Sequence, residues 1–163
     1  MHPRAAEFEE LAAERHGVDV DVDVLEFDAG TETAAAAADA VGCETGAVAS
    51  TIVVSLVGGD REGAHVAAIT SGANRLDLDA VADFFEADAA EMGDPERVRE
   101  VVGWSIGGVP PIGHDAALPT VFDPTLAEYD TVYAAAGTPS AVFAIGPDAL
   151  ADLADATVVD LTE

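Results

Sequence analysis

The sequence predicts an α+β fold, a single domain over residues 1–163 in which helices surround a mixed β-sheet. Its 163 residues are enough for one hydrophobic core, and half of them are hydrophobic. Helix-type and strand-type patterns follow one another irregularly, whereas a doubly wound parallel sheet needs strict strand-helix-strand order. No internal repeat and no linker-like stretch divides the chain.

The N-terminal part opens with two well-defined patterns. Residues 3–16 place apolar side chains at helical spacing and stop at Gly17, a common residue just after a helix end. Residues 18–24 alternate valine with aspartate, which is the period of a strand with one buried face. An alanine-rich helix over 34–41 and a short helical turn over 45–49 are expected next.

The remainder of the chain is rich in strand patterns. Residues 50–57 and 64–70 are β-rich segments joined by a glycine-containing loop, and we expect them to pair as a hairpin. A turn over 71–74 then precedes a helix over about 76–85. The other expected elements are helices over 94–103 and 147–153 and strands over 119–122, 131–135, 141–145 and 157–160.

The chain is extremely acidic. It has 32 Asp and Glu residues against six Arg and no Lys, which gives a net charge of −26. The acidic residues recur between regularly spaced apolar positions, so we expect them on the surface of a folded domain. Lysine-free acidic surfaces are typical of proteins in concentrated salt, because mutual repulsion weakens a compact state in dilute buffer. With no leader pattern and no apolar run of the ~20 residues that a bilayer needs, a salt-loving cytoplasm is the expected location.

Several kinds of chemistry are disfavoured by residue type. Without lysine the chain has no P-loop lysine, no Schiff base and no lysine general base. It has no C-x-x-C or H-E-x-x-H motif, and its four histidines lie far apart in sequence, so no metal or other cofactor is expected. A nucleophile elbow at Ser71 is disfavoured because Ile69 stands where that motif needs glycine. The single cysteine, Cys43, has acidic neighbours that disfavour a thiolate, and we interpret it as an inert thiol.

The segment GWSIGGVPPIGH, from Gly103 to His114, is the most informative part of the chain. Its four glycines and two prolines exclude a helix or a central strand. Glycine lets another molecule approach the backbone closely and proline fixes the chain, so the remaining amides can orient a ligand. His114 is the best candidate acid–base group, because imidazole titrates near neutrality. A purely structural loop and a surface histidine are the alternatives.

The chain resembles the family of YbaK and prolyl-tRNA-synthetase-associated domains over nearly its whole length. The main mark is a glycine-x-x-x-proline loop, which here runs from Gly107 to Pro111. Further similar segments are 48–54, the turn 70–75, the strand 118–123 and the segment 132–137. The combination is much more specific than any one of these segments.

The resemblance implies a largely antiparallel or barrel-like mixed sheet and an activity on aminoacyl-tRNA. That activity is trans-editing hydrolysis of the ester between a wrong amino acid and the 3′-terminal nucleotide, typically alanine or cysteine on the proline tRNA. It needs no metal and no covalent intermediate, and prolyl-tRNA synthetase is an implied partner. Backbone groups of Gly107 and Gly108 would act catalytically, together with the candidate His114. The substrate-binding residues that we expect are Ser50, Thr51, Gly72, Asn74, Pro111, Gly113, Asp123 and Gly137.

Ser50 departs from the family pattern, which has a lysine at this position. Serine keeps a hydrogen-bond donor but is shorter and uncharged. Either a salt-adapted chain discarded every lysine and kept activity through another contact, or the protein is a non-catalytic module that holds charged tRNA or a synthetase. We favour the first explanation because the whole chain lacks lysine. A small-molecule esterase that uses His114 is a third hypothesis.

The negative charge does not exclude RNA binding. In molar salt the screening length falls to ~3 Å, so only groups in direct contact with the RNA matter. Binding would then depend on shape and on hydrogen bonds to the terminal nucleotide more than on a basic patch. Arg75, Arg97 and Arg99 are among the few cations available, although Arg97 and Arg99 are expected on a helix surface.

Overall fold

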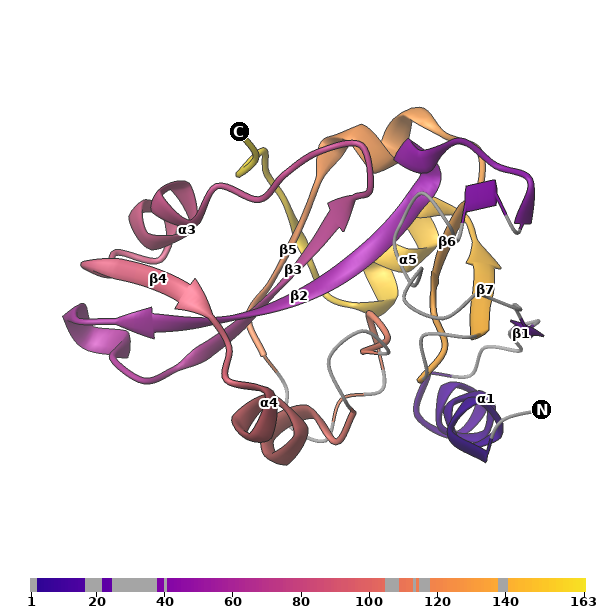
Figure 1. The fold of residues 1–163 in the computed structure, drawn as a ribbon, viewed down its shortest axis with the longest axis horizontal. Coiled ribbons are helices and arrows are strands. Elements are labelled where there is room, and N and C mark those ends of the chain that lie inside the picture. The colour runs from indigo at the N-terminus through magenta and orange to yellow at the C-terminus, as the bar shows by residue number, and fades with distance from the viewer. Residues whose placement is uncertain are drawn as a thin grey trace.

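The computed structural model describes residues 3–16, 22–24, 38–39, 41–104, 109–112, 114, 118–137 and 141–163. Within them, eight strands form one mixed sheet (Figure 1). The strands are β1 (Val22–Val24), β2 (Val48–Val57), β3 (His65–Ser71), β4 (Ala89–Met92), β5 (Thr120–Phe122), β6 (Val132–Ala135), β7 (Ala141–Ile145) and β8 (Thr157–Val158). Their order is β1-β7-β6-β2-β3-β5-β8, and β4 pairs with β2 as well. No ladder joins β1 to β8, so the sheet of the described residues is open.

Helices cover both faces of this sheet. On one face, α1 (Pro3–His16), α4 (Pro95–Val102) and α5 (Pro147–Leu153) contribute to one buried cluster. On the other face, α3 (Leu78–Phe84) contributes to a second cluster. Figure 1 shows α3 beside β4 at one end of the molecule and α1 near β7 at the other. The short 3-10 helices η1 (Thr45–Ala47), η2 (Gly59–Arg61) and η3 (Pro124–Glu128) lie in the connections.

Alternate residues of the central strands enter the two clusters, because side chains point to opposite faces along a strand. The first core contains Phe8, Ala49, Val53, Ile69, Val98, Trp104, Val109, Ile112, Phe122, Phe143 and Leu150 among its buried members. The second core contains Val54, Leu56, Val66, Ala68, Val81, Phe85, Val121 and Leu161. Odd-numbered residues of β2 therefore face the first core and even-numbered ones the second.

Most expected elements are confirmed, including the α+β class and the mixed sheet. The expected hairpin is the antiparallel β2–β3 pair, in register from Ala49↔Ser71 to Ser55↔His65. The helix expected over 147–153 is α5, and the one over 94–103 is α4, closed by Gly103 in the left-handed region at φ 85°.

Three expectations need correction or fall outside the described residues. The turn over 45–49 is wrong in its last two residues, because Val48 and Ala49 already pair with β6. The sequence pattern does not predict β4, since its residues AAEM include none of the β-branched or aromatic types that favour strands. The strand over 18–24 and the helix over 34–41 lie largely outside the described residues, which confirm a strand only over Val22–Val24.

The sheet divides at β2. One edge of β2 pairs with β3 along residues 49–55. The other edge pairs with β6 at Val48 and Ala49, and with β4 from Val54 to Val57. Residues 50–53 therefore have no strand partner on this second edge among the described residues. We name this gap, where β6 and β4 separate along β2 (Figure 1), the fork.

Candidate functional site around the fork

The backbone of Thr51 points into the fork. Hydrogen-bonding groups alternate between the two edges of a strand. The carbonyl of Val53 accepts from the N–H of Gly93 on the β4 side at 2.9 Å, whereas the carbonyl of Leu56 accepts from Gly63 on the β3 side at 2.8 Å. Odd-numbered residues of β2 thus present their N–H and C=O to the second edge. Thr51 and Val53 are the odd-numbered residues in the part of that edge that neither ladder covers, and the carbonyl of Val53 is already paired with Gly93.

The hydroxyl of Thr51 is buried. Thr51 lies on the face of Ala49 and Val53, which belong to the first core. Its Oγ1 has no hydrogen-bond partner within the described part of the chain. Leaving a buried polar group unsatisfied costs roughly 1–3 kcal/mol, so such a group calls for an explanation.

β2 is less completely buried at the fork than on either side of it. The three consecutive residues from Ser50 to Ile52 are half-buried, whereas the residues on both sides of them are buried. Ser50 lies opposite Thr70 in the β2–β3 ladder and faces the second core, so its side chain and that of Thr51 point to opposite faces. Of the two expected binding residues in β2, Thr51 therefore shares a face with the glycine-rich loop.

The described residues of that loop anchor it in the first core. Trp104, Val109 and Ile112 are between 2% and 4% exposed and belong to this cluster, and Pro111 is also buried. Trp104 makes an edge-to-face contact with Phe8, with ring centroids 6.2 Å apart. Gly107, Gly108 and Gly113 lie outside the described residues.

His114 folds back on its own loop. Its Nε2 lies 2.6 Å from the carbonyl oxygen of Pro110. A carbonyl oxygen only accepts hydrogen bonds, so Nε2 carries the hydrogen and donates. In this arrangement Nε2 is a hydrogen-bond donor and does not act as a base.

Two glycines border the fork. Gly93 follows β4 and donates to Val53, and Gly137 follows β6 with a left-handed φ of 93° that favours glycine. A Cβ on Gly93 would lie 2.7 Å from Cγ2 of Val98 and 3.0 Å from the carbonyl oxygen of Val53. Gly93 is thus a residue that shapes the fork. Sequence reasoning missed it, because a glycine before an Asp-Pro helix start indicates no more than a turn.

We expect Gly93→Ala to destabilise the fold by about 1–3 kcal/mol, because the added methyl group would push β4 away from β2 and α4. Urea denaturation in molar potassium chloride measures this change. Gly146→Ala is the matched control, since the nearest atom to its added Cβ is an ordinary contact at 3.9 Å and its φ is −67°. Equal midpoints for the two variants would contradict the tight packing at Gly93.

Asp123 lies in a second group of expected binding residues, where its carboxylate accepts several hydrogen bonds. It is 4% exposed, and its Oδ2 accepts from the N–H of Ser71 at 3.1 Å and from Nδ2 of Asn74 at 3.0 Å. Its Oδ1 accepts from the N–H of Thr125 at 2.9 Å. Because protein donors contact both oxygens, the structure gives Asp123 a bracing role between the turn after β3 and the start of η3.

Apart from those in the glycine-rich loop, the expected site residues form two groups. Ser50 and Thr51 lie in β2 at the fork, and Gly137 lies two residues after the end of β6, which pairs with β2 at Val48 and Ala49. Gly72, Asn74 and Asp123 lie beyond the β3 edge, where the N–H of Gly72 donates to the carbonyl of Val48 at 2.8 Å. This hydrogen bond places the second group near the start of β2, a few residues along the strand from Thr51.

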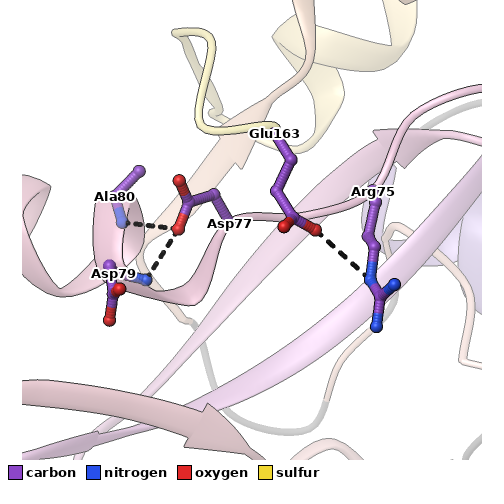
Figure 2. A network of polar contacts seen from close by, with 5 residues as sticks. All are labelled: Arg75, Asp77, Asp79, Ala80 and Glu163. Atoms are coloured by element: carbon purple, nitrogen blue, oxygen red, sulfur yellow. Dashed lines mark hydrogen bonds and ion pairs between the residues drawn. The ribbon is translucent and has the colours of Figure 1, made fainter.

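Arg75 is engaged at the surface. Its Nε lies 3.2 Å from Oε2 of Glu163, and the two side chains are 88% and 57% exposed. Figure 2 shows this ion pair as a dashed line. In the same view the side chain of Asp77 caps α3 by accepting from the N–H groups of Asp79 and Ala80 at 3.0 and 3.3 Å. An exposed pair of this kind contributes only ~0–1 kcal/mol, so Arg75 can exchange Glu163 for another anion at little cost.

Cys43 has the environment of an unreactive thiol. It is half-buried between Gly42 and Glu44. Burial raises the pKa of the Cys43 thiol and the charge of Glu44 raises it further, although a backbone hydrogen bond opposes them. The raised pKa supports the interpretation, made from the sequence, of Cys43 as an inert thiol.

We expect Cys43 to react slowly with iodoacetamide at neutral pH, because a raised pKa leaves less thiolate. The rate should rise with pH around a midpoint above that of the same chain unfolded in denaturant. Since the folded state favours the neutral thiol, this group stabilises the fold at neutral pH, and the contribution is lost as the pH rises through the raised pKa. A folded-state midpoint at or below the unfolded one would contradict the assignment.

No helix in the described residues is long and apolar enough to cross a membrane. The same part of the chain holds no group of three or more His, Cys, Asp or Glu side chains arranged as metal ligands.

Comparisons with known proteins agree with this architecture. Residues 28–153 match the family model described as the aminoacyl-tRNA editing domain. A crystal structure described as a candidate trans-editing enzyme for prolyl-tRNA synthetase is 36% identical, with a TM-score of 0.89 over 100% of this chain and 99% of that one. A structure from work on grafting epitopes onto scaffold proteins is 34% identical, with a TM-score of 0.89 and the same coverage of 100% and 99%. A hypothetical protein at 23% identity shares the fold, with a TM-score of 0.81 over 96% and 99% of the two chains.

Proposed function

Because the chain belongs to the aminoacyl-tRNA editing domain family, we propose that it is an aminoacyl-tRNA deacylase acting in trans. It would hydrolyse the ester between a wrong amino acid and the terminal ribose of a tRNA. Alanine or cysteine on the proline tRNA is the expected substrate, and the relative described as a candidate trans-editing enzyme for prolyl-tRNA synthetase supports this choice. Prolyl-tRNA synthetase is the proposed partner.

The observation that carries this proposal is the common position of the loop and the fork. Val109 and Ile112 of the loop share the first core with Ala49 and Val53, which flank Thr51 in β2. Backbone amides at Gly107 and Gly108 would polarise the ester carbonyl, with Pro111 holding the turn. A water molecule would attack the carbonyl carbon, and the ribose oxygen would leave with a proton.

The proposed site differs from the family pattern at Ser50. In place of a lysine, serine offers a short hydroxyl that faces the second core side of β2. We propose that hydrogen bonds to the terminal nucleotide take over the role of the lysine charge, which molar salt would largely screen.

The proposal is tested with purified protein and alanyl-, cysteinyl- and seryl-tRNA in molar potassium chloride, with Ser50→Lys assayed alongside. We expect release of the amino acid above the spontaneous rate from at least one of these substrates. If no substrate is turned over by either protein, the enzyme function is wrong. Activity that appears only in Ser50→Lys would identify the wild-type protein as non-catalytic.

The second candidate function is a non-catalytic module that holds charged tRNA or a synthetase, and Ser50 is the observation that favours it. Turnover by the wild-type protein that disappears in Gly107→Val would exclude this function, because the change obstructs the proposed cradle. An esterase that uses His114 is excluded if His114→Ala retains tRNA deacylation and the wild-type protein has no activity on simple esters.

A further inference from the structure

Three polar groups of Thr51 come together at the fork. Its N–H and C=O lie on the edge of β2 that the ladders to β4 and β6 leave uncovered. Its Oγ1 is buried without a hydrogen-bond partner within the described ranges. Buried polar groups in folded proteins are nearly always paired. Ser50, Thr51 and Ile52 are only half-buried, so β2 is incompletely covered where these groups lie.

The arrangement matches the hydrogen-bonding groups of an α-amino acid. In a β-ladder, one residue can exchange two hydrogen bonds with the residue opposite, through its own N–H and C=O. An aminoacyl ester carries the complementary pair, a carbonyl acceptor and an α-ammonium donor attached to the same carbon. The ammonium has three N–H donors, so a hydroxyl oxygen nearby can accept a second bond from it.

We propose that Thr51 binds the aminoacyl end of the substrate as a neighbouring strand residue would be bound. Its N–H donates to the ester carbonyl, and its C=O and Oγ1 accept from the α-ammonium. The inference rests on the proposed deacylase function and deepens it by naming the class recognised, which is esters of α-amino acids with a free amino group. Thr51 is in this sense a substrate-positioning residue, and recognition of the side chain lies elsewhere.

The first test changes the substrate and leaves the protein intact. Acetylating the α-amino group of alanyl- or cysteinyl-tRNA removes the ammonium and most of its donors. We expect kcat/KM, corrected for spontaneous hydrolysis, to fall about tenfold or more with the acetylated substrate. An equal kcat/KM for the two forms would overturn the inference. Failure to hydrolyse any free aminoacyl-tRNA would instead refute the proposed function, so the two failures are distinguishable.

The second test removes the hydroxyl alone, through the nearly isosteric Thr51→Val. We expect the melting temperature to rise, because a methyl group replaces an unpaired buried hydroxyl. We also expect kcat/KM to fall about tenfold, mainly through KM. A lower melting temperature would show that the hydroxyl has an internal partner, and unchanged kinetics would show that it holds no substrate. Either result overturns the inference.

Two further variants control this test. Thr51→Ser keeps the hydroxyl and should retain kcat/KM close to the wild-type value. Thr120→Val removes a buried hydroxyl on β5 that does have a partner, since Oγ1 of Thr120 donates to the carbonyl of Leu118 at 2.9 Å. This control should lower the melting temperature and leave the kinetics of the folded protein unchanged. If Thr51 has only a structural role, Thr51→Val should behave like Thr120→Val, with a lower melting temperature and unchanged kinetics.

Discussion

Replacing Asp123 by alanine is expected to destabilise the protein by about 3–5 kcal/mol, since each stranded buried donor costs roughly 1–3 kcal/mol. The change removes the acceptor of two backbone N–H groups, those of Ser71 and Thr125, and of the amide of Asn74. Asn74 keeps its bond to Oγ1 of Thr125 at 2.8 Å, so the loss is concentrated at the two backbone groups. Equilibrium urea denaturation in molar potassium chloride measures the difference.

Two variants make this expectation specific to the buried network. Asp123→Asn keeps one acceptor oxygen and should cost less than Asp123→Ala. Asp160→Ala removes an acidic residue that also accepts bonds from the N–H and hydroxyl of Thr162, but on an exposed surface. It should change stability little. Similar urea midpoints for Asp123→Ala and Asp160→Ala would show that the bracing role is wrong.

Trp104→Ala is expected to cost about 3–5 kcal/mol, the usual loss when a large buried aromatic side chain is truncated. Trp104 is 2% exposed and lies among residues of the first core, where it contacts Phe8 at the edge of its ring. It also stands at the start of the glycine-rich loop. The variant should therefore lose deacylation beyond what its unfolded fraction explains, because the loop loses one of its anchors.

The control for this variant is Trp104→Phe, which keeps an aromatic ring in the same place. It should lose less stability than Trp104→Ala and retain more deacylation per folded molecule. Both quantities come from one preparation, by denaturation and by the mischarged-tRNA assay. A loss below ~1 kcal/mol for Trp104→Ala would mean that the indole is not packed as the structure places it.

Local patterns were enough to predict most elements. Residues 50–57 include a β-branched run, and Pro147 at the first turn of α5 is a typical helix start. No local sequence pattern predicts β4. Its alanine, glutamate and methionine residues form a strand because they pair with the edge of β2. Tertiary pairing thus overrides a weak intrinsic preference.

The site could be predicted only in part, for the same physical reason. The sequence analysis singled out the glycine-rich loop and named Thr51 among eight expected binding residues, but the fork depends on the pairing of Ala49 with Ala134, which no local pattern indicates. The contacts of Asp123 join residues 49 and 52 positions apart in sequence. Only the fold reveals that protein donors contact both carboxylate oxygens of Asp123, which gives this residue a bracing role.

The division of β2 also has a consequence for how the chain folds. The hairpin with β3 is a local contact, whereas the parallel pairing with β6 closes a long stretch of chain and carries a large entropic cost. During synthesis, β2 and β3 can associate as soon as they leave the ribosome, but the second arm of the fork must wait until Ala135 has emerged. The fork would then be among the last parts of the sheet to assemble, after β2 and β3 are both available to pair.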